Sequence, residues 1–535
     1  MIEIAGRTIG AVFAEAVTRH GEADFLMAPP RVGGARLSYD DTAAIVSRWA
    51  ALLRAAGYGT GHRIAVQIGN RPEHLALKLA LNTAGISIVP INPDYRPGEV
   101  AYLLEDSDAV LIVTEPAHVP AIRAGMFEAG RDLPLVMFDE PGSALPPAPA
   151  AAHPPLSPQS EASLLYTSGT TGRPKGCILS HEYELMIGER YLSAGPLMAM
   201  GEGERVLNPL PLYHLNAAAV SFMGMLLAGG CQIQQPRFSA RNWWQDVRES
   251  GATIVHCLGI VVPALMALPP GPEDRDHRVR LAISAGADPS QHRAFERRFG
   301  LELVEIWGMT EMCRILASAE EPSLPETRAI GRPFPGLEVR VVDAADRDLP
   351  PGTPGEMILR HSAETPRHGF FSGYLNKPEA TEAAWRGGWF HTGDTVTQDE
   401  TGMIFFVDRA KNIIRRAGEN IAAAEIEACL HERGEVAQVA VIAVPDPMRE
   451  EEVMACIVPA AGAQPGPELA RALFDHVFTR LAYYKAPGWV LFLDELPVTG
   501  TQKVLKHRIF GPDEDPLARP GIHDLRELKR REAGL

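Results

Sequence analysis

The chain has 535 residues, of which 46% are hydrophobic and 22% are charged, as is typical of a folded globular protein. This length exceeds what one hydrophobic core accommodates, so we expect roughly two to four domains or subdomains. The formal net charge of -16 disfavours nucleic acid or an anionic membrane surface as a partner, because either would select a basic face. The net charge does not exclude anionic small ligands, because their binding depends on the local charge of a site.

Up to about residue 400, segments with helical spacing of apolar residues alternate with short strand-like segments. "YDDTAAIVSRWAALLRAAGYG" (39–59) has apolar residues at helical spacing and ends in a glycine, as helices commonly do. The following segments continue the alternation: strand "RIAVQIG" (63–69), helix "EHLALKLALNTAG" (73–85), strand "SIVPINP" (87–93), helix "GEVAYLLEDS" (98–107) and strand "AVLIVTE" (109–115). This order predicts an α/β fold with a largely parallel sheet.

The later parts of the chain differ in character. The Pro-, Ala- and Ser-rich segment 141–160 indicates a linker or surface crossing. From 337 onward, short strand-like runs around a Pro/Gly turn predict a β-rich subdomain. Past 408 we expect a compact α+β domain with helices at 424–432 and 468–481 and strands at 436–445 and 452–460. We therefore predict a large N-terminal domain (1–408) of α/β subdomains plus a β-rich subdomain, and a small mobile α+β domain (409–535).

Cellular location is indicated by the cysteines and by the absence of targeting features. The six cysteines are scattered with no Cys-x-x-Cys pair, which favours free buried thiols over a disulfide framework or a zinc site. The N-terminus lacks a basic segment followed by a long apolar one. The apolar stretch that starts at residue 217 is too short to span a bilayer and is expected to be a core helix. We expect a cytoplasmic protein without a membrane span, and the sequence leaves a homodimer open.

Residues 164–176, "LLYTSGTTGRPKG", form a polar, glycine-rich loop after a strand-like run. Glycines let successive backbone N–H groups face one point, and such a nest suits phosphate oxygens. The loop is not a nucleotide P-loop, because Pro174 precedes the lysine where that motif requires glycine. The spacing alone leaves two interpretations open, a phosphate-binding loop and a solvated surface loop.

The loop resembles the signature of the adenylate-forming superfamily, which includes acyl-CoA ligases, nonribosomal-peptide adenylation domains and luciferases. Further signatures of that family follow in the same order: "LPLYHLNA" (210–217), "ISAGADPS" (283–290), "EIWGMTE" (305–311), "GRPFPG" (331–336), "GGWFHTGD" (387–394), "DRAKNIIRRAGENI" (408–421) and "PVTGTQKVLK" (497–506). Within the family, the segment 237–259 is similar to carnitine/crotonobetaine-type ligases. The resemblance implies an AMP-forming acyl-CoA ligase that uses ATP, Mg²⁺ and CoA.

In the chemistry that the resemblance implies, a carboxylate attacks the α-phosphate of ATP, and a thiol then displaces AMP from the acyl-AMP. The first step brings two anions together, so it requires positive charge at the point of attack. Lys503 matches the family's catalytic lysine, Glu311 matches the acid that holds Mg²⁺, and Thr310 stands beside that acid. Without the motifs, Lys503 would be interpreted as an exposed surface lysine and Glu311 as a helix-terminal acid.

The resemblance also implies how the nucleotide is held. Asp394 would accept the ribose hydroxyls with Arg409 nearby, Trp307 would stack on adenine where the family usually has tyrosine, and Glu305 would lie near the adenine amino group. The full implied set is Thr167, Ser168, Gly169, Thr170, Thr171, Lys175, Gly286, Ala287, Glu305, Trp307, Gly308, Asp394, Arg409 and Gly418.

Two further features follow from the resemblance. Tyr213 and His214 would line the channel between the acyl site and the incoming thiol, and Lys411 would be the hinge between the domains. Rotation at that hinge would exchange the Lys503 loop for the "RAGEN" loop at the active site. The chain departs from the family at Gln502 and Ala417, where glycine is usual.

The acceptor and the acid are less constrained. No carrier domain follows residue 506, and the remaining residues are expected to form a short charged tail, so free CoA is favoured as acceptor. An acyl-AMP ligase that loads a separate carrier protein, a nucleotide-binding protein that has lost catalysis and a luciferase-like oxygenase stay open. Gly308 stands where acetate-specific relatives have tryptophan, which leaves room for a longer or cyclic acid. Arg314 either pairs with a second anionic group of the acid or forms a surface salt bridge.

Overall fold

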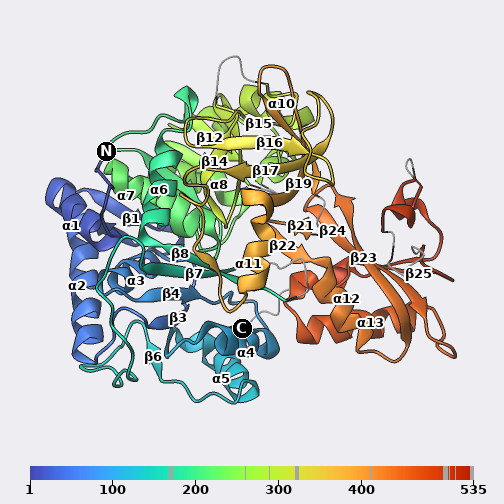
Figure 1. Ribbon diagram of the computed structural model, residues 1–535, viewed down its shortest axis with the longest axis horizontal. Coiled ribbons are helices and arrows are strands. Elements are labelled where there is room, and N and C mark those ends of the chain that lie inside the picture. The colour runs from blue at the N-terminus through green and yellow to red at the C-terminus, as the bar shows by residue number, and fades with distance from the viewer. Residues whose placement is uncertain are drawn as a thin grey trace.

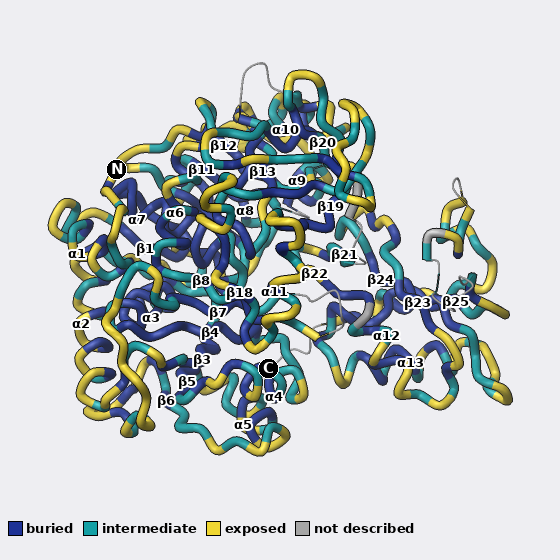
Figure 2. Tube along the Cα trace, in the orientation of Figure 1, coloured by how far each residue is buried: buried dark blue, intermediate teal, exposed yellow. Residues whose placement is uncertain are grey.

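The computed structural model describes residues 1–167, 173–258, 261–287, 289–319, 324–409, 413–497, 504, 506–511 and 514–530 (Figure 1). Strand pairing divides these residues into a large unit with three sheets and a small unit with one sheet. The small unit, coloured orange to red, lies at one side of the large unit in Figure 1. Buried residues fill the interior of both units (Figure 2).

The first sheet of the large unit has seven strands in the order β18-β8-β7-β4-β3-β5-β6. Its central pairs are parallel, whereas β8 is antiparallel to both of its neighbours, β7 and β18. The strands are β3 (Arg63–Gln67), β4 (Ser87–Pro90), β5 (Leu111–Thr114), β6 (Leu135–Met137), β7 (Glu161–Thr167), β8 (Lys175–Ser180) and β18 (Gly373–Tyr374). The helices among them are α3 (Pro72–Thr83), α4 (Pro97–Ser107) and α5 (Val119–Glu128).

The second sheet has eight strands in the order β14-β13-β12-β11-β9-β10-β1-β2. Strand β1 pairs parallel with β10, so that Leu26 lies opposite Gln232 although the two are far apart in sequence. The strands are β1 (Asp24–Met27), β2 (Arg36–Ser38), β9 (Arg205–Asn208), β10 (Cys231–Gln234), β11 (Ile254–His256), β12 (Leu281–Ser284), β13 (Glu302–Met309) and β14 (Met312–Ala317). The helices around it are α1 (Ile9–His20), α2 (Tyr39–Ala55), α6 (His181–Leu192), α7 (Ser221–Ala228), α8 (Trp243–Ser250), α9 (Val261–Met266) and α10 (Pro289–Phe299).

The third sheet is antiparallel and has five strands in the order β15-β20-β19-β17-β16. Short β-strands with tight turns make this the β-rich part that the sequence predicts. Its strands are β15 (Ala329–Gly331), β16 (Glu338–Val342), β17 (Gly355–Arg360), β19 (Phe390–Gln398) and β20 (Ile404–Arg409), and α11 (Pro378–Ala384) precedes β19.

The small unit has a six-stranded sheet, with β22-β21-β24-β25-β26 in order and β23 paired to β24. Its strands are β21 (Ile413–Arg416), β22 (Glu419–Ala422), β23 (Val436–Asp446), β24 (Glu450–Pro459), β25 (Trp489–Phe492) and β26 (Ile522–Asp524), and its helices are α12 (Ala423–His431) and α13 (Pro467–Arg480). The predicted fold class, a large α/β domain with a β-rich part and a small α+β domain, is confirmed. The boundary at 408/409 stays a prediction, with β20 ending at Arg409 and β21 starting at Ile413.

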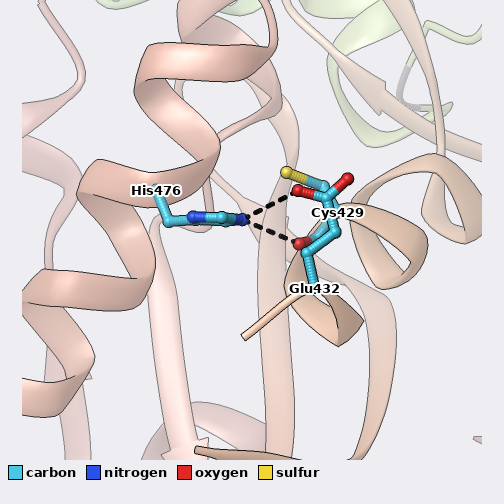
Figure 3. Close-up of side chains that lie close together, drawn as sticks. All are labelled: Cys429, Glu432 and His476. Carbon is cyan, nitrogen blue, oxygen red and sulfur yellow. Dashed lines mark hydrogen bonds and ion pairs between the residues drawn. The ribbon is translucent and has the colours of Figure 1, made fainter. Parts of the chain in front are cut away.

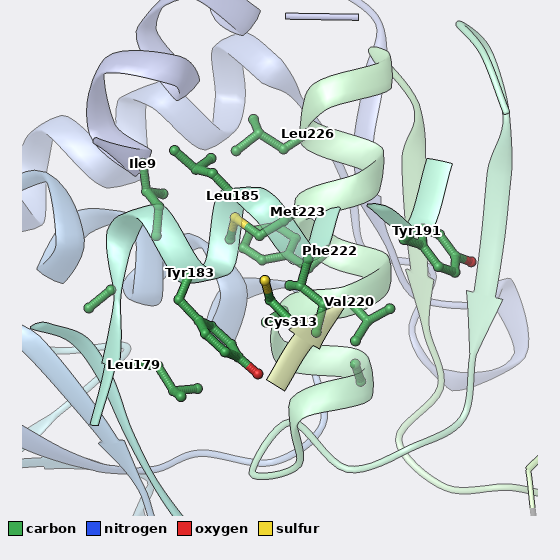
Figure 4. Packing of buried hydrophobic residues seen from close by; sticks show 14 of the residues in the cluster. Ile9, Leu179, Tyr183, Leu185, Tyr191, Val220, Phe222, Met223, Leu226 and Cys313 are labelled. Carbon is green, nitrogen blue, oxygen red and sulfur yellow. The ribbon is translucent and has the colours of Figure 1, made fainter. Parts of the chain in front are cut away.

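The core of the large unit depends on a close crossing of α6 and α7 (Figure 4). A Cβ on Gly188 would lie 2.5 Å from Met223 Cβ, and one on Gly224 would lie 2.5 Å from Tyr191 Cδ1. Since real Cβ atoms do not approach so closely, glycine is what allows these helices to touch. Phe222 of α7 is fully buried, and its ring centroid lies 5.7 Å from that of Phe25 on β1.

Four sequence expectations can now be compared with the structure. Segment 141–160 forms no helix or strand and crosses the surface, where Thr60 donates to the Pro154 carbonyl at 2.6 Å. All six cysteines are buried and free, as predicted. The expected charged tail is wrong for residues 514–530, because β26 pairs with β25 and Lys529 is buried against Glu452 at 2.6 Å. No helix within the described ranges is long and apolar enough to cross a membrane.

Candidate active site

A cavity of about 290 Å³ opens where the β13–β14 turn, the β7–β8 pair and the first strands of the small unit meet. Its walls therefore come from both units, and the site is assembled by their contact. The lining residues are Thr167, Lys175, Leu210, His214, Leu215, Asn216, Val220, Leu258, Ala285, Ile306, Gly308, Met309, Thr310, Glu311, Ile315, Tyr374, Thr392, Ile413, Arg415, Gly418, Glu419, Asn420 and Glu450.

In the lining of the cavity, an acid and a cation both contact one aromatic ring. Glu311, in the turn between β13 and β14, is 7% exposed, and its Oε1 accepts from Tyr374 Oη at 2.7 Å. Lys175 Nζ lies 4.9 Å from the centroid of the Tyr374 ring. Burial raises the pKa of Tyr374, so its phenol stays protonated and donates to the carboxylate. The Thr310 carbonyl accepts from Tyr183 Oη at 2.9 Å, which anchors the turn that presents Glu311.

Behind the cavity, Trp307 and Asp394 are joined directly. Trp307 Nε1 donates to Asp394 Oδ2 at 2.9 Å, and both residues are buried. Asp394 lies on β19 opposite Arg409 of β20, whose side chain lies outside the described part. The indole thus orients the carboxylate, a contact that the sequence did not predict.

Glu305 braces the turn that carries Gly286 and Ala287. Its carboxylate accepts from the Gly286 N–H and from the Ala287 N–H, the latter at 3.3 Å. Burial raises the pKa of Glu305, and the two backbone donors oppose that rise. Gly286 has φ +86°, a conformation that glycine adopts without strain.

The small unit contacts Tyr213 and His214, the residues expected to line a channel, through Glu419. Tyr213 Oη donates to Glu419 Oε1 at 2.7 Å, and His214 Nε2 lies 3.2 Å from Glu419 Oε2. Burial alone would raise the pKa of Glu419, but His214 and Tyr213 outweigh it, so this pKa lies below its ordinary value. Gly418, at φ +87°, makes the turn that delivers Glu419 to the cavity.

Arg415 and Glu450 of the small unit lie over the Gly286 turn. A Cβ on Gly286 would be 3.2 Å from Arg415 Nη1 and 3.5 Å from Glu450 Oε1, so a larger residue would press against both. Burial raises the pKa of Glu450 to about 7, with Arg415 opposing the rise. The two units therefore meet here through charged groups.

A second interface contact lies on α4 of the large unit. Lys485 Nζ is 2.6 Å from Glu99 Oε1 and 2.9 Å from Glu425 Oε1, and the lysine side chain is 5% exposed. Burial alone would lower the pKa of Lys485, but the two carboxylates outweigh it and raise this pKa. Asn92 Nδ2 donates to Tyr484 Oη at 2.9 Å across the same interface.

Many of the residues singled out in the sequence come together at this site, although their roles stay predictions. Tyr213, Glu305, Trp307 and Asp394 surround the cavity without lining it. The predicted residues that line it are Thr167, Lys175, His214, Gly308, Thr310, Glu311 and Gly418. The predicted residues outside the described part are Ser168, Gly169, Thr170, Thr171, Lys411 and Lys503.

Arg314 occupies neither of its two expected environments. Its neighbour Ile315 lines the cavity, and since side chains alternate along a strand, Arg314 points to the other face of β14. Its Nε donates to the His368 carbonyl at 3.4 Å rather than to a carboxylate of the described residues. The sequence analysis also missed Tyr374, Asn216, Arg415 and Glu450, which stand outside the usual signatures or between their key positions.

A cluster of Cys429, Glu432 and His476 in the small unit has the side-chain types of a metal site (Figure 3). His476 Nε2, however, lies 3.0 Å from the Cys429 carbonyl and 3.3 Å from Glu432 Oε2. Arg480 Nε is also 3.3 Å from that Glu432 oxygen, and burial raises the pKa of the Cys429 thiol to about 12. A protonated thiol and a carboxylate already paired with arginine are poor ligands, so we interpret this cluster as a tie between α12 and α13.

Comparison with known proteins agrees with this arrangement. Residues 13–375 match the family model of the AMP-binding enzymes, and residues 425–503 match the model of the AMP-binding enzyme C-terminal domain. The chain therefore belongs to the AMP-binding enzyme family, as the sequence signatures predict.

The named relatives narrow this likeness. The chain is 32% identical to a sulfoacetate–CoA ligase of Cupriavidus necator, over 94% of this chain and 97% of that protein. It is 30% identical to a crotonobetaine/carnitine–CoA ligase of Citrobacter koseri, over 89% and 93% of the two chains. Among solved structures, it is similar to the amide bond synthetase McbA from Marinactinospora thermotolerans, with 27% identity, a TM-score of 0.79 and coverage of 94% and 99%.

Proposed function

We propose that this chain is an AMP-forming acid–CoA ligase. An oxygen of the acid attacks the α-phosphorus of ATP, the bond to the β-phosphate breaks, and pyrophosphate leaves. The CoA sulfur then attacks the acyl carbon, AMP leaves, and the proton of the thiol passes to solvent. The observation that carries this proposal is the cavity itself, whose lining brings together Lys175 and Glu311, apolar residues of β13 and β14, and residues of the small unit.

In this proposal the part of the cavity at Lys175 and Glu311 holds the phosphates. Lys175 would offset the phosphate charge, and the backbone of the loop that precedes it would donate hydrogen bonds. Mg²⁺ fits the buried carboxylate of Glu311, which is a hard oxygen donor, and when bound it would add positive charge at the phosphates. Asp394, oriented by Trp307, would accept the ribose hydroxyls.

The second half-reaction is supported by the contact of Glu419 with Tyr213 and His214. Val504 and Lys506, the described residues around Lys503, belong to the small unit's own packing: Lys506 Nζ donates to the Val441 carbonyl at 3.0 Å. We infer that this orientation serves thioester formation and that rotation near Lys411 brings Lys503 to the cavity for adenylation.

The test is pyrophosphate release across a panel of carboxylic acids, with and without CoA. We expect release with a subset of acids and a thioester only when CoA is present. Acid-dependent AMP formation that never yields a thioester would contradict the CoA half of the proposal. Absence of pyrophosphate release with every acid would contradict the first half, as expected for a nucleotide-binding protein that has lost catalysis.

A second candidate differs only in the acceptor. The similarity to an amide bond synthetase, at 27% identity over 94% of this chain, favours including amines as acceptors in the same assay. An amide product without a thioester would support this candidate. Transfer to an added carrier protein, with indifference to CoA, would instead support an acyl-AMP ligase.

A further inference from the structure

The cavity has apolar as well as charged lining residues. Among the described residues, the lysine and arginine side chains that line it are Lys175, beside the Tyr374 ring, and Arg415, over the Gly286 turn. Apolar lining residues come, among other places, from the segment that leads into α7 (Leu215 and Val220), from β13 (Ile306 and Met309) and from β14 (Ile315).

Asn216, which lies between Leu215 and Val220 in the chain, places a neutral polar side chain among these residues. It begins the π-helical turn Asn216–Val220 that leads into α7. Segments of π-helix are rare and often occur at functional sites. Because an amide has a donor end and an acceptor end, the effect of Asn216 on a ligand depends on which end faces the cavity.

The orientation of Asn216 is determined by Asn208 behind it. The Leu210 N–H, which can only donate, bonds to Asn208 Oδ1 at 3.0 Å. Asn208 must therefore direct its Nδ2 away from Leu210, and this Nδ2 donates to Asn216 Oδ1 at 3.0 Å. The acceptor end of Asn216 is thus occupied, and its Nδ2 remains as the end available to the cavity.

Buried polar residues behind Asn208 fix this arrangement. Asn208 Nδ2 also lies 2.9 Å from Ser221 Oγ, and Ser221 Oγ donates to Gln232 Oε1 at 2.8 Å. Gln232 Nε2 in turn donates to Gln234 Oε1 at 3.1 Å. Asn208, Ser221, Gln232 and Gln234 are all fully buried, so flipping one amide would leave buried groups unpaired.

We propose that Asn216 recognises the acid through its Nδ2 donor. The preferred substrate is then a carboxylic acid with a mainly apolar acyl part that bears one neutral hydrogen-bond acceptor, such as a keto, hydroxyl or ether oxygen. A second anionic group is disfavoured at the position next to Asn216, since this neutral donor does not offset the cost of burying a charge. The proposal rests on the ligase activity proposed above and specifies its substrate class.

The test measures acid-dependent ATP–pyrophosphate exchange with matched pairs of acids. Each pair has equal length and differs by one oxygen, as in 5-oxohexanoate and hexanoate. Glutarate and sulfoacetate serve as dianionic probes. We expect kcat/KM for the oxygen-bearing member to exceed that of its partner by roughly ten- to a hundredfold, because a donor left unpaired in the complex penalises the plain acid. The dianions should be poorer substrates than both.

Three variants connect the preference to the donor. In Asn216→Leu the ratio within a pair should fall to about threefold or less. Asn216→Asp keeps an acceptor for Asn208 but removes the cavity donor, so it should lose the preference even if Asn216→Leu fails to fold. Val220→Ala changes the wall without touching the donor and should alter both members of a pair alike.

The outcomes separate this proposal from the one it rests on. If none of the acids supported exchange, the result would contradict the ligase activity. Exchange with plain and oxygen-bearing acids alike, or a preference that survives in Asn216→Asp, would overturn the role of Asn216 while leaving the ligase activity in place. Efficient use of a dianion by the unmodified chain would also overturn it.

Discussion

Replacing Glu419 by glutamine tests whether the contact between the units serves one half-reaction. The Glu419 carboxylate accepts from Tyr213 at 2.7 Å and lies 3.2 Å from His214, and its side chain is 15% exposed. Hydrogen bonds to charged groups contribute about 1.5–3 kcal/mol and neutral ones about 0.5–1.5 kcal/mol. The substitution should therefore destabilise this orientation by about 1–2 kcal/mol, which is roughly a five- to thirtyfold change in its population.

The assay follows the two half-reactions separately. Transfer from preformed acyl-AMP to CoA should slow by roughly five- to thirtyfold, whereas acid-dependent pyrophosphate exchange should keep its rate. Glu435→Gln is the matched control, because Glu435 is a partly exposed acid of the small unit that pairs with Arg433. Combining Glu419→Gln with Tyr213→Phe should give less than the sum of the two effects, since both remove one bond.

The pH dependence of the Glu419→Gln effect gives a further check on the role of this carboxylate. Because the pKa of Glu419 lies below its ordinary value of about 4.5, its charge contributes at every pH above that value and is lost only as the pH falls through its lowered pKa. Between about pH 6 and 9 the carboxylate stays ionised, so a change of the Glu419→Gln effect within this range would come from its partners and not from Glu419 itself. Equal slowing of both half-reactions, or no change in thioester formation, would refute the role of this contact.

Three other substitutions have expected outcomes. Trp307→Phe keeps an aromatic ring but removes the donor to Asp394, so KM for ATP should rise by about tenfold or more in a pyrophosphate-release assay. Gly308→Trp should restrict the enzyme to short acids, seen as a loss of kcat/KM that grows with chain length across a homologous series. Glu450 holds its proton up to about pH 7, so the stability it lends is present below about pH 4.5 and lost as pH rises through 7. Glu450→Gln should therefore raise the melting temperature relative to the unmodified chain more at pH 8 than at pH 5.

Local pattern was sufficient to predict most elements of the fold. Helix α2 and strand β3 follow from apolar spacing and terminal glycines, which depend only on neighbouring residues. The place of β1 beside β10 does not, because the pairing of Leu26 with Gln232 joins segments some two hundred residues apart. Its stability depends on packing that no local pattern encodes.

The candidate site shows the same division. The signatures identified Glu311 and Lys175, but the ring of Tyr374 that lies between them comes from a strand without a signature. The expectation that Glu305 lies near the nucleotide base stays a prediction, and its hydrogen bonds to the Gly286 and Ala287 N–H groups could not be predicted locally, because they depend on how β13 lies beside β12.

The interface between the units explains how a site assembled from both can still open. A buried lysine that loses all its partners leaves an uncompensated charge, which is costly. Lys485 avoids this, because Glu425 belongs to the same unit and Glu99 to the other. If the small unit rotates as proposed, Lys485 keeps one carboxylate while Glu99, at the N-terminal turn of α4, is released to solvent and to the helix N–H groups beside it. Each charge then keeps a favourable environment in both orientations, and the balance between them depends on the weaker contacts at Glu419 and Asn92.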